Sequence, residues 1–201
     1  MEHQTLEQAL RSGALDQRLA AVYGAEGVEK AKERCTAAAA GFTKTFESTP
    51  EAFFSAPGRT ELGGNHTDHQ HGRVLAAAVD LDILAAAAPN QSGMLRIQSQ
   101  GYPMIVVDLR ELAPQSGEEN TSAALIRGVA ARMAALGCPL TGSGLDAYVI
   151  SDVPGGSGLS SSAAFEVLIG TMLNDLFWDG KCSAVEIAQI GQYAENVFFG
   201  K

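Results

Sequence analysis

The fold is decided by the stretch PGGSGLSSSAA, residues 154–164, which connects an apolar, strand-like segment to an apolar, helix-like one. Glycines permit positive φ and let a backbone approach an anion closely, and the N-terminus of a following helix offers unpaired N–H groups at the positive end of its dipole. The hydroxyls of Ser160, Ser161 and Ser162 suit the first turn, where they can cap the helix, contact phosphate oxygens or bind Mg²⁺. The stretch therefore predicts a phosphate-binding loop between a strand and a helix.

The two familiar phosphate motifs do not fit this stretch. A P-loop requires a lysine after its second glycine, and residues 154–164 contain no lysine. A dinucleotide fingerprint counted from Gly156 and Gly158 would need a third glycine where Ser161 stands. On this stretch alone, a plain glycine-rich turn with a serine cap stays open.

Composition limits the classes of function. The chain has 201 residues, a formal net charge of −9 and no Lys/Arg-rich run, which argues against binding to nucleic acid or an acidic membrane. The three cysteines are far apart and odd in number, which is typical of reduced thiols in a cytoplasmic protein: Cys35, Cys138 and Cys182. The longest low-polarity stretch, Val74–Pro89, is too short to cross a bilayer and is interrupted by Asp80 and Asp82.

Hydrophobic periodicity predicts an α+β layout in one domain, residues 1–201. Period-3.6 patterns and alanine-rich segments predict helices over residues 1–40, 121–136, 164–176 and 187–198. Apolar runs and alternation predict strands over residues 53–55, 74–88, 95–98, 104–109 and 145–150. We expect Ala56-Pro57-Gly58 to end the first strand, and a largely antiparallel sheet with helices on one face.

A second polar segment lies between the first two predicted strands. Residues 56–69 contain an arginine, two carboxylates, an amide and two imidazoles, a density typical of a ligand site on a loop. Arg59 supplies a positive charge that does not titrate, and Asp68 can accept hydrogen bonds from two neighbouring sugar hydroxyls. A solvated polar loop is the open alternative for this segment taken alone.

Together, the two segments resemble a known family. The order Pro-Gly-Arg, then Gly-x-His-Thr-Asp, then Gly-Leu-Ser-Ser-Ser-Ala-Ala is similar to the galactokinase branch of the GHMP small-molecule kinases, from a helical leader of about residues 1–45 through the last helix. This resemblance implies the GHMP kinase N-terminal domain, a ribosomal protein S5 domain 2-like fold. It also implies a cytoplasmic enzyme that phosphorylates the anomeric hydroxyl of galactose with ATP and Mg²⁺.

The resemblance also implies roles for particular residues. Arg59 would stabilise charge on the transferred phosphoryl group, and Ser162 and Glu195 would bind Mg²⁺. The sugar-binding residues would be Asn65, His66, Thr67 and Asp68. The residues wrapped around the ATP phosphates would be Gly156, Ser157, Gly158, Leu159, Ser160, Ser161 and Ser162.

The chain departs from the family signature at four positions. Glu61 replaces an asparagine, Gly63 replaces an apolar residue, Asn65 replaces the glutamate that binds sugar, and His69 replaces a tyrosine. An amide can accept a hydrogen bond from the sugar, but without charge assistance. The resemblance implies galactose as the substrate, and these departures leave N-acetylgalactosamine, galacturonate and arabinose open as alternatives.

The sequence stops at Lys201, before the Gly-(Ile/Leu)-Met-Asp segment that carries the family's catalytic aspartate. The family's C-terminal GHMP domain is also absent from these 201 residues, and we expect the chain to pack against such a domain. These absences predict negligible sugar phosphorylation by the 201-residue chain alone.

Three alternatives remain beside the sugar kinase. A non-catalytic sugar and ATP sensor is known on the same scaffold. A metal site could form from His66, His69 and His71 beside Asp68, although transition-metal sites need three or four convergent ligands. A mevalonate- or homoserine-type kinase would share the glycine-serine loop but not the His-x-Asp segment.

Overall fold

The structure, a computed structural model, describes residues 5–64 and 72–200. The helices are α1 (Leu6–Ser12), α2 (Asp16–Tyr23), the short η1 (Ala25–Gly27), α3 (Val28–Phe46), α4 (Ser122–Ala135), α5 (Ser161–Trp178), α6 (Ala184–Ala194) and the π-helical turn η3 (Glu195–Phe199). The strands are β1 (Ala52–Gly63), β2 (Leu75–Asn90), β3 (Met94–Ser99), β4 (Ile105–Asp108) and β5 (Gly144–Ser151). None of the helices in these described ranges is both long and apolar enough to cross a membrane.

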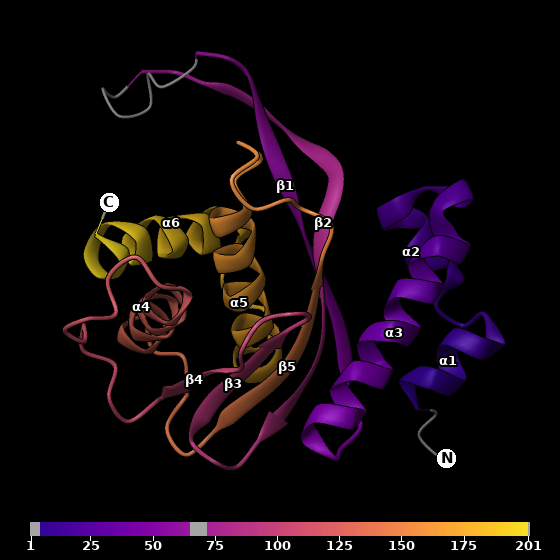
Figure 1. Ribbon diagram of the computed structural model, residues 1–201, viewed down its shortest axis with the longest axis horizontal. Helices are drawn as coiled ribbons and strands as arrows, with labels where there is room; N and C mark the ends of the chain where they lie inside the picture. Colours follow the sequence, from indigo (N-terminus) through magenta and orange to yellow (C-terminus); the bar gives the residue numbers. More distant parts are fainter. Residues whose placement is uncertain (1–4, 65–71, 201) are drawn as a thin grey trace.

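The five strands form one sheet in the order β1-β2-β5-β3-β4 (Figure 1). All neighbouring pairs are antiparallel except β3 and β5, which are parallel. The predicted α+β class and largely antiparallel sheet are therefore confirmed. The sheet brings the end of β5, which leads into the glycine loop, beside the middle of β2.

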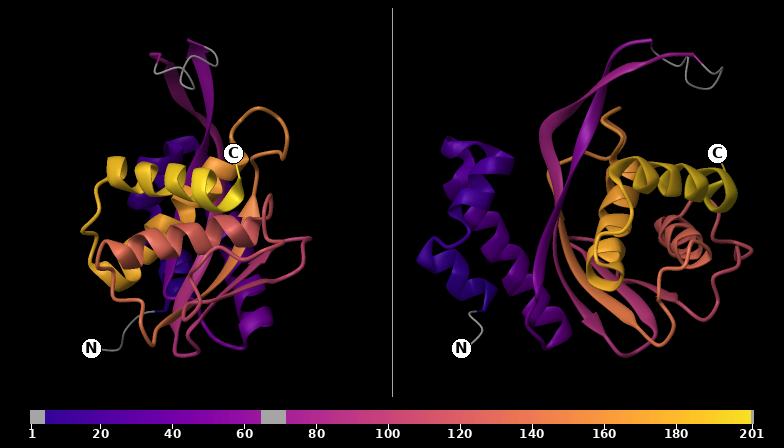
Figure 2. Two further views of the ribbon diagram at one scale, coloured as in Figure 1. Left: turned by 90° about the vertical axis from the view of Figure 1, so that its left-hand side faces the viewer. Right: turned by 180° about the vertical axis from the view of Figure 1, so that it is seen from behind.

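Helices cover both faces of the sheet, whereas the sequence analysis expected them on one. Helices α4, α5 and α6 lie on one side, and the leader helices α1, α2 and α3 lie on the other (Figure 2). The two layers have separate apolar cores. Leu168, Met172 and Leu173 belong to the larger core, while Cys35 and Phe42 of α3 belong to the second. The leader helices thus complete the burial of the sheet's second face.

Strand β1 is longer than the sequence analysis predicted, because Pro57 does not end it. β1 is an edge strand, where a residue without an N–H can be accommodated. The register shifts between Pro57 and Arg59, and the strand continues to Gly63. Residues 59–63, expected in a loop, therefore lie on a strand. Beyond this shift β1 and β2 project from the body as a two-stranded arm (Figure 1).

The leader is attached to the sheet by a buried carboxylate. Asp82 on β2 accepts hydrogen bonds from the Tyr23 hydroxyl at 2.6 Å, from Arg34 Nη1 at 2.6 Å and from the Ser55 hydroxyl. Only 8% of the Asp82 side chain is exposed. Buried carboxylates require such partners, because an unpaired buried charge is strongly destabilising. The interruption of an apolar run by Asp82 therefore marks a contact between layers.

This contact predicts a stability change at high pH. Burial, followed by the hydrogen bond to Asp82, raises the pKa of Tyr23 to about 12. A raised tyrosine pKa means that the folded state retains the proton, so this contribution to stability is complete below about pH 10 and is lost as the pH rises through about 12. The difference in the free energy of unfolding between wild type and Tyr23→Phe, measured with urea, should decrease between about pH 10 and pH 12. The Tyr23 phenolate absorbance, taken as the wild-type minus Tyr23→Phe difference, should appear near pH 12; its appearance near pH 10 would contradict the assignment.

Candidate active site

The glycine loop has the backbone conformation that its sequence predicts. Gly156 and Gly158 have φ of 70° and 78°, and Ser160, the residue before α5, has φ of 57°. A Cβ atom added at Gly156 or Gly158 would meet nothing within 4 Å. The glycines are therefore required by their backbone angles, and the space beside them stays open.

The glycine loop ends at the N-terminus of α5. The Ser160 side chain makes no capping hydrogen bond, and the Ala164 N–H donates to the Ser160 carbonyl at 3.0 Å. An α-helix leaves its first N–H groups without intrahelical partners, at the positive end of the helix dipole. These donors, together with the hydroxyls of Ser161 and Ser162, make this terminus suitable for an anion.

The arginine segment lies directly against the glycine loop. The Arg59 N–H donates to the Leu159 carbonyl at 3.0 Å. A Cβ atom at Gly58 would lie 2.9 Å from the same carbonyl oxygen and 3.2 Å from Val153. A side chain at Gly58 would therefore force β1 away from the loop. This close approach joins two segments that are far apart in the sequence.

The Arg59 side chain is half exposed and forms an ion pair with Glu61. The Arg59 Nη1 atom lies 2.9 Å from Glu61 Oε1, and 45% of the Arg59 side chain is exposed against 18% for Glu61. Residues two apart on a strand share one face, which explains the pairing. The backbone of Arg59 therefore contacts the glycine loop, while its guanidinium charge is partly neutralised by Glu61.

Ser162 and Glu195 are also brought together. The Ser162 hydroxyl donates a hydrogen bond to Glu195 Oε1 at 3.1 Å, from the first turn of α5 to the first residue of η3. Mg²⁺ prefers oxygen ligands, and it is commonly held by one or two protein groups together with phosphate oxygens and water. A hydroxyl and a carboxylate at this separation fit such a site.

Close helix packing positions Glu195, a feature that the sequence analysis missed. A Cβ atom at Gly128 on α4 would lie 2.7 Å from the Ala194 Cβ and 2.8 Å from the Ala194 Cα. Similarly, a Cβ atom at Gly191 would lie 3.0 Å from a carboxylate oxygen of the buried Glu166. The backbone before Glu195 is thus in close contact with both neighbouring helices. Glycines inside predicted helices were the available signal for these approaches.

The predicted sugar-binding residues lie outside the described residues: Asn65, His66, Thr67 and Asp68. His69 and His71, which the metal-site alternative requires, lie there too. Within the described ranges, no group of three His, Cys, Asp or Glu side chains could hold a metal ion. The sugar site and the histidine alternative both remain sequence-based predictions.

Two family signatures match this chain. The "galactokinase galactose-binding signature" matches residues 40–89, and the "GHMP kinases N terminal domain" matches residues 124–201. Neither signature includes residues 1–39, which contain α1, α2 and most of α3. The match to the first signature therefore includes Arg59, and the match to the second includes the glycine loop and Glu195.

Comparisons with individual proteins also indicate similarity to galactokinases. A galactokinase from Lacticaseibacillus paracasei is 36% identical over 161 residues, which cover 80% of this chain and 41% of the relative. A crystal structure of Lactococcus lactis galactokinase complexed with galactose covers 84% of this chain and 43% of that one, with 29% identity and a TM-score of 0.76. A mevalonate kinase from Methanococcus jannaschii, at 19% identity and a TM-score of 0.60 over 75% of this chain and 47% of that chain, shares the fold.

The chain spans about 40% of the length of the galactokinases it resembles. Both signatures, the sequence identity and the superposition indicate the same family, and the arginine segment contacts the glycine loop through the Arg59 N–H. The chain belongs to the GHMP kinase family, in which it corresponds to the N-terminal portion of galactokinases.

Proposed function

We propose that this chain is the sugar- and ATP-binding part of a kinase that phosphorylates galactose at its anomeric hydroxyl. The observation that carries the proposal is the contact between Arg59 and Leu159, which joins the arginine segment to the glycine loop. Phosphoryl transfer depends mainly on positioning and on neutralising charge at the γ-phosphate. A loop that cradles phosphates, an arginine and a metal site in one place are the parts that this chemistry requires.

In this proposal the residues bind the nucleotide, the metal and the sugar, and Ser162 contributes to the first two. The stretch from Gly156 to Ser162 wraps the ATP phosphates with backbone N–H groups and hydroxyls, and Arg59 stabilises charge on the transferred group. Ser162 and Glu195 hold Mg²⁺, which supplies charge neutralisation on the phosphates when it is bound. Asn65 to Asp68 bind the sugar, and Asp68 accepts hydrogen bonds from its ring hydroxyls.

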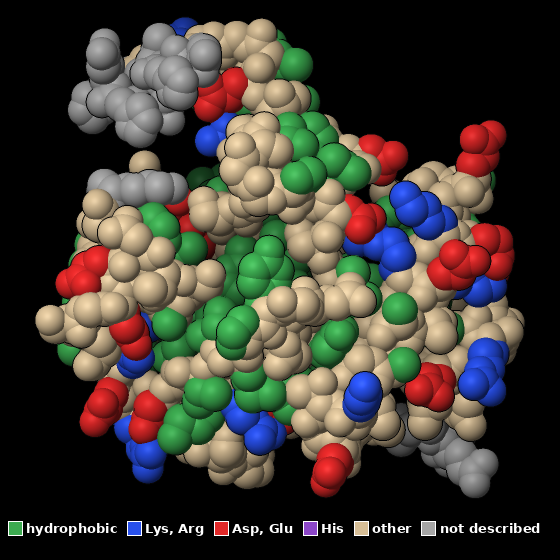
Figure 3. Space-filling model, viewed as in Figure 1, with side chains coloured by type: hydrophobic (Ala, Val, Ile, Leu, Met, Phe, Trp, Pro, Cys, Tyr) green, Lys and Arg blue, Asp and Glu red, His purple; other side chains and the backbone are tan. Residues whose placement is uncertain are grey.

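We also propose that a further GHMP domain packs against this part of the protein. Leu62 and Leu75 on the arm are 64% and 65% exposed, and Val106 on β4 is 52% exposed. Hydrophobic side chains gather in the centre of the face seen in Figure 3. Exposed apolar patches of this kind are typical of surfaces that another domain covers.

The test of this function separates binding from turnover. The purified 201-residue chain should bind galactose in ligand-observed NMR, and it should bind glucose, which differs in configuration at C4, more weakly. It should form no detectable sugar phosphate from galactose and ATP, since it has no Gly-(Ile/Leu)-Met-Asp segment. Equal binding of the two sugars would refute the galactose assignment. Sustained turnover would refute the expectation that phosphorylation also requires the aspartate of the Gly-(Ile/Leu)-Met-Asp segment.

Asn65 gives a prediction about sugar choice. Asn65→Glu restores the residue type of the galactokinase signature and adds a charged acceptor. If Asn65 contacts the sugar, the ranking of galactose, N-acetylgalactosamine, arabinose and galacturonate in the same NMR experiment should change. Galacturonate should lose most, because two carboxylates would repel each other. An unchanged ranking would remove Asn65 from the sugar site.

Glu61 gives a prediction about phosphate binding. Glu61→Asn removes the carboxylate that lies 2.9 Å from Arg59 and leaves the guanidinium charge available to the phosphates. Nucleotide binding should tighten about fivefold, corresponding to roughly 1 kcal/mol for an exposed ion pair. Titration with an ATP analogue checks this expectation. Glu119→Gln, an acid-to-amide change on the loop before α4, serves as the control. Weaker binding by Glu61→Asn would show that Glu61 assists the site.

A further inference from the structure

The leader helices contact the sheet close to the start of the glycine loop. Arg34 on α3 pairs with Asp82 on β2 at 2.6 Å and with Asp152 at 3.3 Å. Asp152 follows the last residue of β5 and comes two residues before Pro154, which opens the loop. One guanidinium therefore joins the leader, the second strand of the sheet and the base of the loop.

The backbone reinforces this connection. The Asp152 N–H donates a hydrogen bond to the Asp82 carbonyl at 2.9 Å. The two residues whose carboxylates pair with Arg34 are therefore also joined to each other through their backbones. The next residue, Val153, is 4% exposed and lies beside Gly58. Contacts thus run without interruption from Arg34 through Asp152 and Val153 to the Gly58-Arg59 segment.

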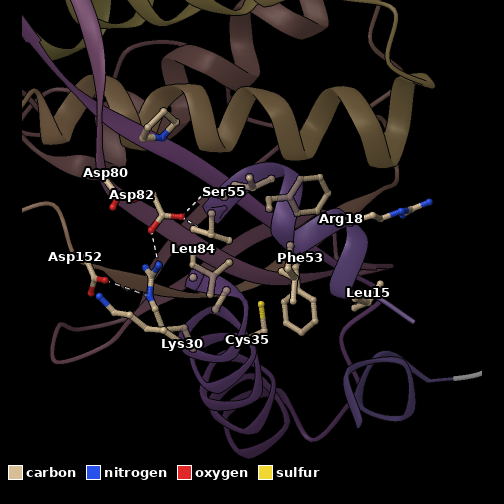
Figure 4. A pocket seen from close by; sticks show the side chains of 18 of the residues that line it. Leu15, Arg18, Lys30, Cys35, Phe53, Ser55, Asp80, Asp82, Leu84 and Asp152 are labelled. Atoms are coloured by element: carbon tan, nitrogen blue, oxygen red, sulfur yellow. Dashed lines mark hydrogen bonds and ion pairs between the residues drawn. The ribbon is translucent and has the colours of Figure 1, made fainter. Parts of the chain in front are cut away.

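Arg34 lies where apolar packing of the leader is incomplete. A cavity of about 670 Å³ separates part of the leader from β1 and β2, and its lining includes Arg18, Lys30, Asp80, Asp82 and Asp152. Figure 4 shows Asp82 and Asp152 at one end of this cavity and Arg18 and Leu15 at the other. The apolar contacts of α3 continue from Cys35 to Phe42, toward the end of the helix away from the loop. At the loop end the ion pairs of Arg34 make the connection.

We propose that Arg34 is a positioning residue that holds the base of the glycine loop, and that the leader helices thereby set the geometry of the nucleotide site from the opposite face of the sheet. Residues 1–39, including Arg34, lie outside both family signatures. The expected effect of Arg34 on nucleotide affinity rests on the proposed function. The expected effect of Arg34 on the order of the glycine loop does not depend on that function.

Two substitutions on the same helix separate this role from general leader stability. Arg34→Met removes the connection. Lys32→Met removes a cation of α3 that pairs with Asp16 and Glu29, both within the leader. Hydrogen exchange of the amides from Val153 to Leu159 should accelerate about tenfold in Arg34→Met and stay at the wild-type rate in Lys32→Met. Affinity for a non-hydrolysable ATP analogue should fall about tenfold in the first variant only.

Asp152→Asn provides a second variant that leaves the buried Asp82 contacts in place. Because the Asp152 side chain is 35% exposed, this variant should fold even where Arg34→Met does not. It should accelerate exchange in the same amides, and Arg34→Lys, which keeps the charge, should restore part of the protection lost in Arg34→Met. Exchange equal to that of Lys32→Met in both Arg34→Met and Asp152→Asn would overturn the proposal. If the wild-type chain binds no nucleotide, the proposed function fails, and the exchange rates still decide the role of Arg34.

Discussion

Glu195→Gln is expected to weaken binding of the Mg²⁺ complex of an ATP analogue by about 10- to 100-fold. The substitution keeps the shape of the side chain but removes the charge that lies beside the Ser162 hydroxyl. Interactions that involve one charged partner contribute about 1.5–3 kcal/mol, which corresponds to this change in affinity. Ser162→Ala should weaken binding in the same direction but by less, because a neutral hydroxyl is the weaker Mg²⁺ ligand.

A second acid-to-amide substitution, at the opposite end of α5 from Ser162, provides the control. Asp179→Asn makes the same acid-to-amide change just beyond the other end of α5, at a residue with φ of 52° that asparagine tolerates. Calorimetric titration should give wild-type affinity for Asp179→Asn. In the absence of Mg²⁺, the difference between wild type and Glu195→Gln should disappear. A Glu195→Gln effect that persists without Mg²⁺ would mean that Glu195 acts on the protein or on the nucleotide directly.

Gly128→Ala is expected to destabilise the fold although alanine is the better helix former. Its Cβ would lie 2.7 Å from the Ala194 Cβ, 2.8 Å from the Ala194 Cα and 3.0 Å from the Phe198 ring. Relief of these contacts requires α4 and α6 to move apart, and overpacking of this kind costs about 1–3 kcal/mol. A loss of this size should lower Tm by about 3–10 °C in a chain of this length.

The same substitution should also affect the site, because Ala194 is followed by Glu195. Gly63→Ala is the control, since a Cβ there would meet nothing within 4 Å. Thermal unfolding should show a Tm close to wild type for Gly63→Ala and a clear decrease for Gly128→Ala. Nucleotide affinity should fall in Gly128→Ala well below the unfolding temperature. An unchanged Tm in Gly128→Ala would show that the two helices can separate at no cost.

Much of the fold could be predicted from the sequence because local patterns agree with the final structure. The strand, glycine loop and helix around residues 154–164 require backbone angles that glycine and a helix start supply, and the structure has them. The prediction that the first strand ends at Pro57 was wrong, because a proline in an edge strand costs little and only the tertiary structure shows which strand lies at the edge. The leader helices were predicted, but their position on the second face of the sheet was not, because an alanine-rich helix gives no indication of the face that it covers.

The site was predictable only where residue types are unusual. The serine run and the arginine segment stood out, and the structure brings Arg59 beside the loop and Ser162 beside Glu195. The contact between Arg34 and Asp82 could not be predicted, because nothing in either segment identifies its partner. The roles of Asn65 to Asp68 remain predictions, as those residues lie outside the described ranges.

The most direct test of the central claim is a calorimetric titration of the 201-residue chain with a non-hydrolysable ATP analogue, with and without Mg²⁺. The claim is that the glycine loop, Ser162 and Glu195 form a site for a metal-bound nucleotide beside Arg59. It predicts saturable binding at a one-to-one ratio that weakens at least tenfold when Mg²⁺ is removed. No saturable binding, or binding of equal strength in both conditions, would contradict it.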